Sequence, residues 1–267
     1  MSGRITKIND NNTVGSLPIV GKLKVGEIGK SAGGKDIPRS LDYFKADGKY
    51  AELFHQKLGK NPKKIAVAFL TDNISSVCNE RFESWDNGSM RGFKFGYGDG
   101  DTFYIYDPAK SKYIEWAKGD DGFEEEMKKY KWQAILTLRF VVLELRGVMG
   151  QWQLTTRGAK SSIPGIVDSF DFVKNKAGTI IGLPFDLIVS KNSGRNLNKE
   201  GTKIQSTSYP IIGLVPNFTE ENIQSVRDYV AAGGNPAEMG ILTMDMKKLN
   251  TAPETKAIEA PNQTPDE

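Results

Sequence analysis

The sequence is poor in the residues on which many catalytic and metal sites depend. Of its 267 residues, one is a cysteine, Cys78, and one is a histidine, His55. A single cysteine cannot form an internal disulfide, which is typical of a reducing cytoplasm. A single histidine excludes a multi-histidine metal site and leaves Ser-His-Asp or Cys-His catalysis dependent on one side chain. We therefore expect no catalytic residue, no metal and no cofactor.

The sequence also lacks long apolar runs and a signal peptide. Charges or glycines interrupt each apolar run within about a dozen residues, whereas a membrane-spanning helix needs about 20. The first sixteen residues are polar throughout, rather than basic and then apolar. These absences predict a cytoplasmic protein without membrane contact. Hydrophobic residues make up 38% of the chain and charged residues 26%, which is enough apolar material for a buried core.

Charge is distributed unevenly along the chain. The net charge is +3, but residues 1–64 carry 13 basic and 6 acidic side chains. Residues 99–130 carry nine acidic side chains and five lysines, and residues 251–267 carry four acidic side chains and one lysine. A basic body with an acidic tail is typical of proteins that contact nucleic acid weakly and in a salt-dependent manner. Lysines that only keep the surface soluble would produce the same distribution.

Three regions follow from composition and periodicity. We expect a flexible N-terminal arm over residues 1–20, an α+β core over 21–249 and a disordered acidic tail over 250–267. The core is predicted to be mainly antiparallel β with a few helices, forming a partly open sheet or a barrel-like structure. Two subdomains meeting near residue 130 are an alternative to a single unit.

Hydrophobic periodicity predicts the individual elements of the core. Residues 134–145 are apolar on both faces and should form a central strand, with which residues 151–156 pair. The other predicted strands are 19–29, 63–72, 179–190 and 203–215. The predicted helices are 50–59, 119–132, one starting at Ser161 or Ser162 with Pro164 in its first turn, and 219–230.

Aromatic residues are concentrated between Arg81 and Tyr106. A turn signal at residues 86–88 predicts a hairpin there, and glycines interrupt the strand that follows. The stretch RGFKFGYG matches the RNA-recognition signature at Arg91, Gly92, Phe93 and Phe95 only, so a complete RNA-recognition domain is not expected. Aromatic rings beside cations can still stack on bases and neutralise phosphates. Alternatively, the aromatic residues form a core and the lysines are solvated.

Two basic segments add candidates for DNA contact. The glycine-rich residues 29–35 fail as a phosphate loop because Asp36 stands where Ser or Thr must bind magnesium, and a basic loop or hairpin is expected instead. Residues 191–203 are expected to form a long, mobile, cationic loop, either a DNA-contacting flap or a plain surface loop. The candidate nucleic-acid-binding residues are Lys35, Arg39, Arg91, Phe93, Lys94, Phe95, Tyr97, Arg157, Lys160, Lys191, Arg195 and Lys199.

Two further segments resemble a known family. PRSLDYF at Pro38–Phe44 precedes GQWQLTTRGAKSSI at Gly150–Ile163, and this order resembles the phage recombination directionality factor-like family. It is also similar to related phage proteins loosely labelled hydrolase or metal-binding. The matching positions are Pro38, Arg39, Leu41, Asp42 and Phe44 in the first segment, and Gly150, Trp152, Leu154, Thr156 and Gly158 in the second.

The resemblance implies a phage or mobile-element protein of the bacterial cytoplasm that acts in DNA recombination without catalysis. Such factors bind a serine integrase and shift it from integration toward excision. An alternative is a protein that binds single-stranded DNA through its aromatic and basic surface, regulated by the acidic tail. A lesser alternative is a metal-dependent phosphoesterase, for which carboxylates such as Asp42, Asp72, Glu83 and Asp99 would have to converge. An oligomer is compatible with each of these functions.

Overall fold

The computed structural model of the protein describes residues 17–30, 33–86, 92–145, 147–197 and 204–234. The expected N-terminal arm lies largely outside these residues, and the acidic tail lies entirely outside them. The helices are α1 (Ala51–Leu58), α2 (Ile74–Val77), α3 (Phe123–Lys128), α4 (Ser162–Ala177) and α5 (Glu220–Ala231). The strands are β1 (Ile19–Lys30), β2 (Asp36–Asp47), β3 (Lys64–Ala68), β4 (Cys78–Trp85), β5 (Lys94–Gly98), β6 (Thr102–Asp107), β7 (Lys112–Ala117), β8 (Gln133–Val142), β9 (Gln151–Thr156), β10 (Phe185–Leu197) and β11 (Ile204–Pro216).

All these strands belong to one branched sheet with β8 at its centre. One path through the sheet runs β2-β1-β9-β8-β4-β5-β6-β7, and a branch β3-β10-β11 joins β8 near its C-terminal end. Each pairing is antiparallel except that of β1 with β9. The sheet does not close. The prediction of an α+β, mainly antiparallel fold with a partly open sheet is therefore confirmed, and the barrel-like alternative is not.

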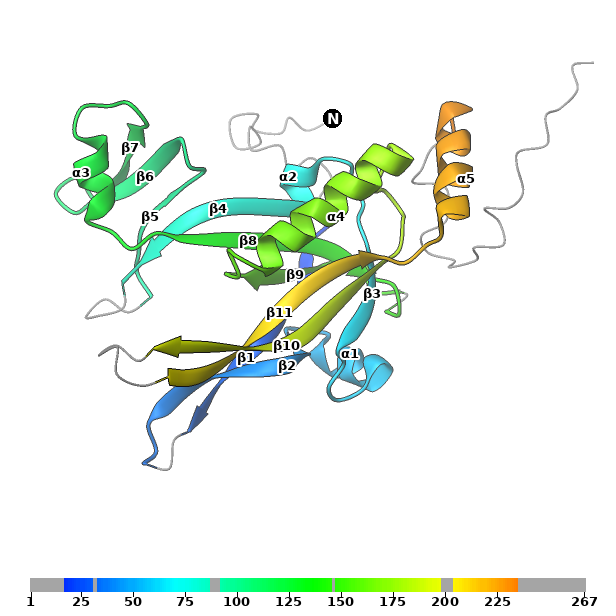
Figure 1. The fold of residues 1–267 in the computed structure, drawn as a ribbon, viewed down its shortest axis with the longest axis horizontal. Helices are drawn as coiled ribbons and strands as arrows, with labels where there is room; N and C mark the ends of the chain where they lie inside the picture. Colours follow the sequence, from blue (N-terminus) through cyan, green and yellow to red (C-terminus); the bar gives the residue numbers. More distant parts are fainter. Residues whose placement is uncertain (1–16, 31–32, 87–91, 146, 198–203, 235–267) are drawn as a thin grey trace, which may run out of the picture.

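The core explains why β8 is central. Leu136, Leu138 and Phe140 on one face of this strand are buried, and Ile135 and Thr137 on the other face are buried as well, as the apolar character of both faces predicts. Helix α4 lies across the sheet (Figure 1) and packs Phe170 against Phe69, with ring centroids 4.7 Å apart. Phe185 of β10 closes this aromatic group, 5.3 Å from Phe69. Strands β3, β8 and β10 and helix α4, which are far apart in the sequence, thus contribute to one hydrophobic cluster.

Two helix starts were predicted from capping residues, and they behave differently. Thr219 caps α5 as expected, because its hydroxyl accepts a hydrogen bond from the Asn222 backbone and Asn222 reciprocates. Ser161 precedes α4 but makes no side-chain capping bond. The neighbouring Ser162 hydroxyl instead accepts a hydrogen bond from the Ile212 amide at 2.9 Å. This bond ties the start of α4 to β11.

Two long hairpins, β1–β2 and β10–β11, extend beyond the core and contact each other through β2 (Figure 1). The expectation of a long cationic loop over 191–203 is wrong over part of its length. The backbone stays in β10 as far as Leu197, which pairs with Ile204 of β11. The pairing satisfies the backbone hydrogen-bonding groups that a loop would leave open. Residues 198–203 lie outside the described part of the chain.

The remaining predictions differ mainly in their bounds. Helix α1 agrees with the predicted 50–59, whereas the helix predicted over 119–132 is limited to α3 at Phe123–Lys128. Three glutamates lie in its first turn and Lys128 in its last, an arrangement that complements the helix dipole. None of the helices in the described residues combines the length and the apolar character needed to cross a bilayer.

Candidate functional site

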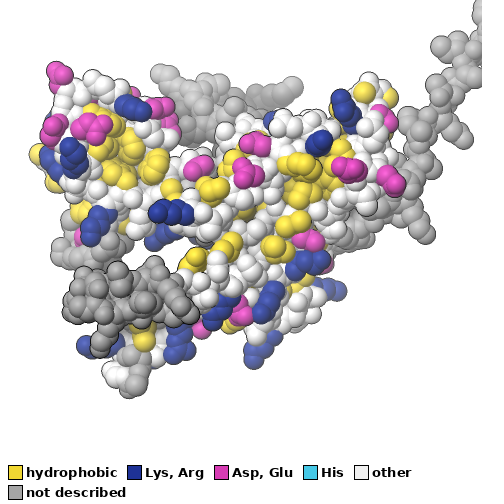
Figure 2. Space-filling view, viewed as in Figure 1, with side chains coloured by type: hydrophobic (Ala, Val, Ile, Leu, Met, Phe, Trp, Pro, Cys, Tyr) yellow, Lys and Arg dark blue, Asp and Glu magenta, His cyan; other side chains and the backbone are white. Residues whose placement is uncertain are grey.

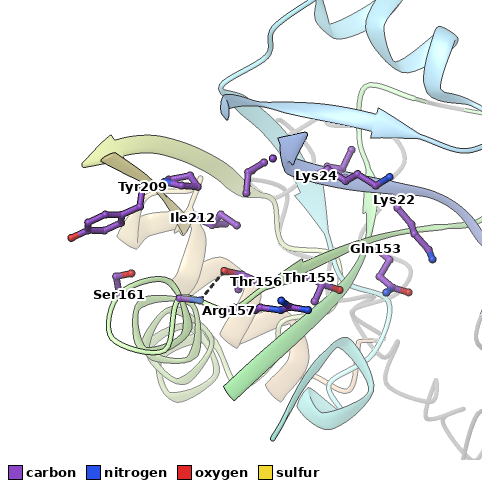
Figure 3. Close-up of a pocket in the computed structure, with 14 residues that line it drawn as sticks. Lys22, Lys24, Gln153, Thr155, Thr156, Arg157, Ser161, Tyr209 and Ile212 are labelled. Carbon is purple, nitrogen blue, oxygen red and sulfur yellow. Dashed lines mark hydrogen bonds between the residues drawn. The ribbon is translucent and has the colours of Figure 1, made fainter. Parts of the chain in front are cut away.

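A cavity of about 740 Å³, named here the basic groove, opens between β1, β9, β11 and the start of α4 (Figure 3). Its cationic side chains are Lys22 and Lys24 of β1 and Arg157, which follows β9. Its polar and aromatic lining includes Gln153, Thr155, Ser161 and Tyr209.

Strand pairing explains how these side chains meet. Lys22 is the register partner of Gln153 in the parallel β1–β9 pair, so neighbouring side chains of the two strands line one side of the groove. Lys24 also forms a 2.5 Å ion pair with Asp47 of β2. Ser161, at the N-terminal end of α4, lines the groove as well, and that end carries the positive pole of the helix dipole. The groove therefore suits an anionic group such as the phosphate of a nucleic acid.

A second surface lies on β5, β6 and β7, whose two faces differ in composition. The inner face holds the buried side chains of Phe103 and Ile105, covered by Phe123 of α3. Gly96 on this face leaves room for Trp132, since a Cβ there would lie 2.7 Å from the Trp132 ring. Figure 2 shows hydrophobic side chains gathered over this part of the molecule, with both acidic and basic side chains around them, and basic side chains are numerous over the two hairpins.

The outer face, named here the tyrosine face, carries four tyrosine side chains: Tyr97, Tyr104, Tyr106 and Tyr113. Tyr97 and Tyr104 are register partners, and their rings stack with centroids 5.1 Å apart. Tyr113 lies 5.4 Å from Tyr97 and 5.5 Å from Tyr106. Tyr97 is 37% exposed and Tyr113 is 38% exposed, so the rings combine mutual packing with access from solvent.

A buried carboxylate anchors one side of the tyrosine face. Glu83 accepts hydrogen bonds from Lys94 Nζ at 2.6 Å, Arg81 Nε at 2.7 Å and Trp85 Nε1 at 2.8 Å. Burial by itself would raise the pKa of Glu83, but the three donors outweigh burial and hold the pKa below its ordinary value. The carboxylate is therefore ionised at neutral pH and fixes the position of Lys94.

An irregularity in strand pairing brings Lys94 to this face. Ser84 pairs with Gly96, whereas the next residue, Trp85, pairs with Lys94, so Phe95 is an extra residue in β5. The Lys94 ammonium consequently lies 4.8 Å from the Trp85 ring and 5.8 Å from the Tyr97 ring.

Acidic side chains lie beside the tyrosines. Glu115 is the register partner of Tyr104 and hydrogen-bonds its hydroxyl, which raises the pKa of Tyr104 above its ordinary value. Asp99 adds to this effect through its charge and is itself fixed by the backbone amides of Asp101 and Thr102. The local potential at Tyr104 is therefore negative.

The aromatic residues predicted to stack on nucleic acid are linked by ring contacts but differ in exposure: Phe93 and Phe95 are half-buried with centroids 5.6 Å apart, and Phe93 adjoins the tyrosine face at Tyr106. Lys94 and Tyr97 meet on the tyrosine face. Phe93 is half-buried against Tyr106, with centroids 4.9 Å apart, and Phe95 packs near Tyr130 at 5.8 Å.

The predicted basic residues are dispersed. Lys35 and Arg39 are exposed near the turn of the β1–β2 hairpin, where Arg39 donates a hydrogen bond to the Lys30 carbonyl at 3.2 Å. Lys160 is exposed before α4, Lys191 is exposed on β10, and Arg157 lines the basic groove. Arg91 and Lys199 lie outside the described residues, as does the side chain of Arg195.

The sequence-based predictions missed Lys22, Lys24 and Tyr209. The alternation of residues 19–29 places Lys22 and Lys24 on one face of a strand, and this signal could have identified both lysines. Nothing in the sequence indicates that Tyr209 and Arg157 line the same groove.

The four carboxylates considered for a metal site have separate partners. Asp42 pairs with Lys63 at 2.6 Å, and Asp72 accepts hydrogen bonds from Thr179 and Ile180. Glu83 and Asp99 are held as described above. Within the described part of the chain, no three His, Cys, Asp or Glu side chains are grouped to hold a metal ion. The convergence that a phosphoesterase would require of these four residues is therefore not observed.

Comparison with known protein families gives a match that extends from β1 to β11. The model of the Gp3-like family, described as recombination directionality factor-like, matches residues 20–217. The chain belongs to this recombination directionality factor-like family. No curated protein and no solved structure matches it.

The recombination directionality factor-like region includes both hairpins, the central strand and the tyrosine face, and it ends one residue after β11. The two segments that carried the resemblance lie on β2 and on the stretch from β9 to α4. Phe44 and Trp152 in these segments are fully buried. These family positions therefore support the fold, and the resemblance inferred from them is confirmed.

Proposed function

We propose that the protein is a non-enzymatic accessory factor of phage or mobile-element recombination that binds a recombinase, specifically a serine integrase. The observation that carries this proposal is the family match over residues 20–217. A factor that binds one conformation of a recombinase more tightly than another shifts the equilibrium between them by its differential affinity. A tenfold shift requires only about 1.4 kcal/mol of differential binding, so no chemical step by this protein is needed.

The exposed tyrosine face supports binding to a partner protein. Tyrosine is enriched at protein interfaces because its ring supplies apolar area and its hydroxyl supplies a polar contact. The face lies on strands within the family match, on the side of β5–β7 opposite α3. It therefore belongs to the part of the chain that defines the family.

Complex formation with the cognate integrase tests this proposal. The full chain and the purified integrase are mixed without DNA, and the mass of the complex is measured by size-exclusion chromatography with light scattering. We expect a defined complex at micromolar concentrations, in the range of a specific interface. Separate elution of the two proteins, both without DNA and with attachment-site DNA present, would contradict the proposal.

Binding of single-stranded DNA is a second candidate, favoured by the basic groove. Lys22, Lys24 and Arg157 could neutralise phosphates, and Tyr97 beside Lys94 offers an exposed ring. Fluorescence anisotropy with labelled single-stranded and duplex oligonucleotides tests this function. A single-strand-binding protein would show affinity that increases with strand length and decreases steeply with salt. Feeble binding to both forms favours the accessory role.

A further inference from the structure

We infer that the tyrosine face binds an arginine- or lysine-rich segment of a partner protein rather than the bases of a nucleic acid. The inference rests on the proposed function and adds the chemistry of the contact. Three properties of the face carry it: uncovered rings, exposed negative charge, and a cation already placed over two rings.

The rings are uncovered although they belong to an ordered sheet. The opposite face of β5–β7 is packed beneath α3, whereas Tyr97 and Tyr113 remain more than one-third exposed. Their positions are nevertheless fixed, since Tyr97 stacks on Tyr104 and the Tyr113 hydroxyl donates a hydrogen bond to the Lys94 carbonyl at 2.9 Å. Binding a partner there costs little side-chain ordering, because the rings are already in place.

The charges on this face distinguish between the two kinds of partner. Two cations beside these rings, Arg81 and Lys94, both pair with Glu83 and are only 34% and 27% exposed. The exposed charges beside Tyr104 are the carboxylates of Glu115 and Asp99. Phosphates would be repelled by this surface, whereas arginine and lysine side chains would be attracted.

Lys94 shows how a cation is accommodated on these rings. Its ammonium lies within 6 Å of both the Trp85 and the Tyr97 ring centroids, which is the distance range of cation–π attraction. A partner arginine can stack in the same way on the exposed part of Tyr97 or Tyr113. Its guanidinium would then lie near the Glu115 carboxylate, so that ring contact and charge pairing reinforce each other.

The basic groove is a separate surface and provides an internal comparison. Its lysines are on β1, which is separated from β5 by β9, β8 and β4 along the sheet. Variants of the groove and of the tyrosine face should therefore act independently.

The test uses the full chain and two fluorescent probes of equal length, an arginine–serine repeat peptide and a thymidine oligonucleotide. Affinities are measured by anisotropy for the wild type, Tyr97→Ala, Glu115→Lys and the matched control Glu115→Gln. We expect the peptide to bind more weakly to Tyr97→Ala by about fivefold. Glu115→Lys should weaken peptide binding by about tenfold, and Glu115→Gln should weaken it less.

The sign of the Glu115→Lys effect separates the two kinds of partner. If the face binds nucleic acid, Glu115→Lys should raise the affinity for the oligonucleotide. Adding Tyr97→Ala to that variant should then reverse the gain. That result would overturn the inference. Failure of the wild type to bind the peptide would overturn it as well. Arg157→Ala in the basic groove should leave peptide binding unchanged. Because Tyr97 and Glu115 are exposed, circular dichroism should show that both variants fold.

The same variants distinguish failure of this inference from failure of the proposed function. If the wild-type chain forms no complex with the integrase, the proposed function is contradicted, whether or not the peptide binds. If the wild type forms the complex and Tyr97→Ala and Glu115→Lys form it equally well, the accessory role stands and the inference is wrong.

Discussion

Glu83 has an unusual environment for a carboxylate. Its side chain is only 4% exposed and accepts three hydrogen bonds. Replacing it with glutamine removes the charge while Arg81 and Lys94 remain. We expect Glu83→Gln to lower the free energy of unfolding by about 2 kcal/mol at neutral pH, less than for a fully buried pair because both cations are partly solvated. Urea denaturation of the wild type and the variant measures this difference.

The pH dependence of that difference follows from the lowered pKa of Glu83. Burial opposes the ionised form, but the hydrogen bonds from Lys94, Arg81 and Trp85 outweigh it. A lowered pKa in the folded state means that the carboxylate stabilises the fold at neutral pH. The stabilisation decreases once the pH falls below about 4.5, the ordinary glutamate value, and is lost below the folded-state pKa. An equal difference between wild type and variant at neutral pH and at about pH 3 would contradict this account.

Cys78 provides a second prediction at the level of the residue. Burial, reinforced by the charges of Glu80 and Asp171, raises the pKa of its thiol to about 12. The thiolate is the reactive form, so the native protein should react with a thiol reagent at pH 8 far more slowly than the urea-unfolded chain. The rate of modification by a chromogenic disulfide checks this expectation. Equal rates in the two states would show that Cys78 is accessible.

Single residues also show what the sequence could and could not predict. Alternation predicted short strands rich in aromatic residues, but it did not assign Tyr97, Tyr104 and Tyr113 to one face and Phe103 to the other. It could not reveal the extra residue at Phe95, because a bulge depends on the partner strand as well as on its own sequence. Phe95 accordingly contacts Phe93 and Tyr130, whereas Tyr97 stacks on Tyr104.

At the scale of elements, the close contact between β1 and β9 leaves no room for a side chain at Gly21. A Cβ at Gly21 would overlap the ring of the fully buried Trp152. We expect Gly21→Ala to lower the free energy of unfolding by about 2 kcal/mol or more, since the ring has no room to move. Thermal or urea denaturation measures the loss.

Gly165→Ala in α4 is the matched control. A Cβ at Gly165 meets nothing within 4 Å, and the residue lies within a helix of 16 residues. Alanine there should raise the free energy of unfolding by about 0.5–1 kcal/mol, because it restricts the unfolded backbone. If the two substitutions destabilise equally, the contact with Trp152 does not limit the size of residue 21.

Elements with one strongly apolar face were predictable, and long polar hairpins were not. The strand over residues 134–145 and the helix α5 follow from periodicity and capping alone. β2 and the outer part of β10 carry mostly exposed polar residues near their turns, so no buried face revealed them. Their strand structure depends on hydrogen bonding to a partner hairpin strand, which sequence alone does not specify.

At the scale of the whole molecule, the sheet assembles the basic groove from distant parts of the chain. β1 pairs in parallel with β9, although well over 100 residues separate them, and Tyr209 approaches from β11. Such long-range pairings could not be derived from local patterns, and the groove was consequently missed.

The groove makes a prediction about DNA. Any residual affinity of the isolated protein for DNA should depend on Lys22 and Arg157. Each lost phosphate contact reduces the slope of log affinity against log salt by about 0.7–0.9, so Lys22→Ala combined with Arg157→Ala should reduce it by about 1.5. Anisotropy at several salt concentrations measures the slope. Lys110→Ala, near Asp107 and far from the groove lining, is the control. A groove variant that retains the wild-type slope would exclude the groove as the DNA contact.

The central claim is that this chain redirects recombination by binding and not by catalysis. The most direct test incubates the cognate integrase with excision substrates and increasing amounts of the full chain, and measures recombinant product. We predict that excision appears only with the factor and saturates near one factor per integrase subunit, as expected when it acts by occupancy. No excision at any ratio would contradict the account, and so would full excision at a small fraction of one factor per subunit.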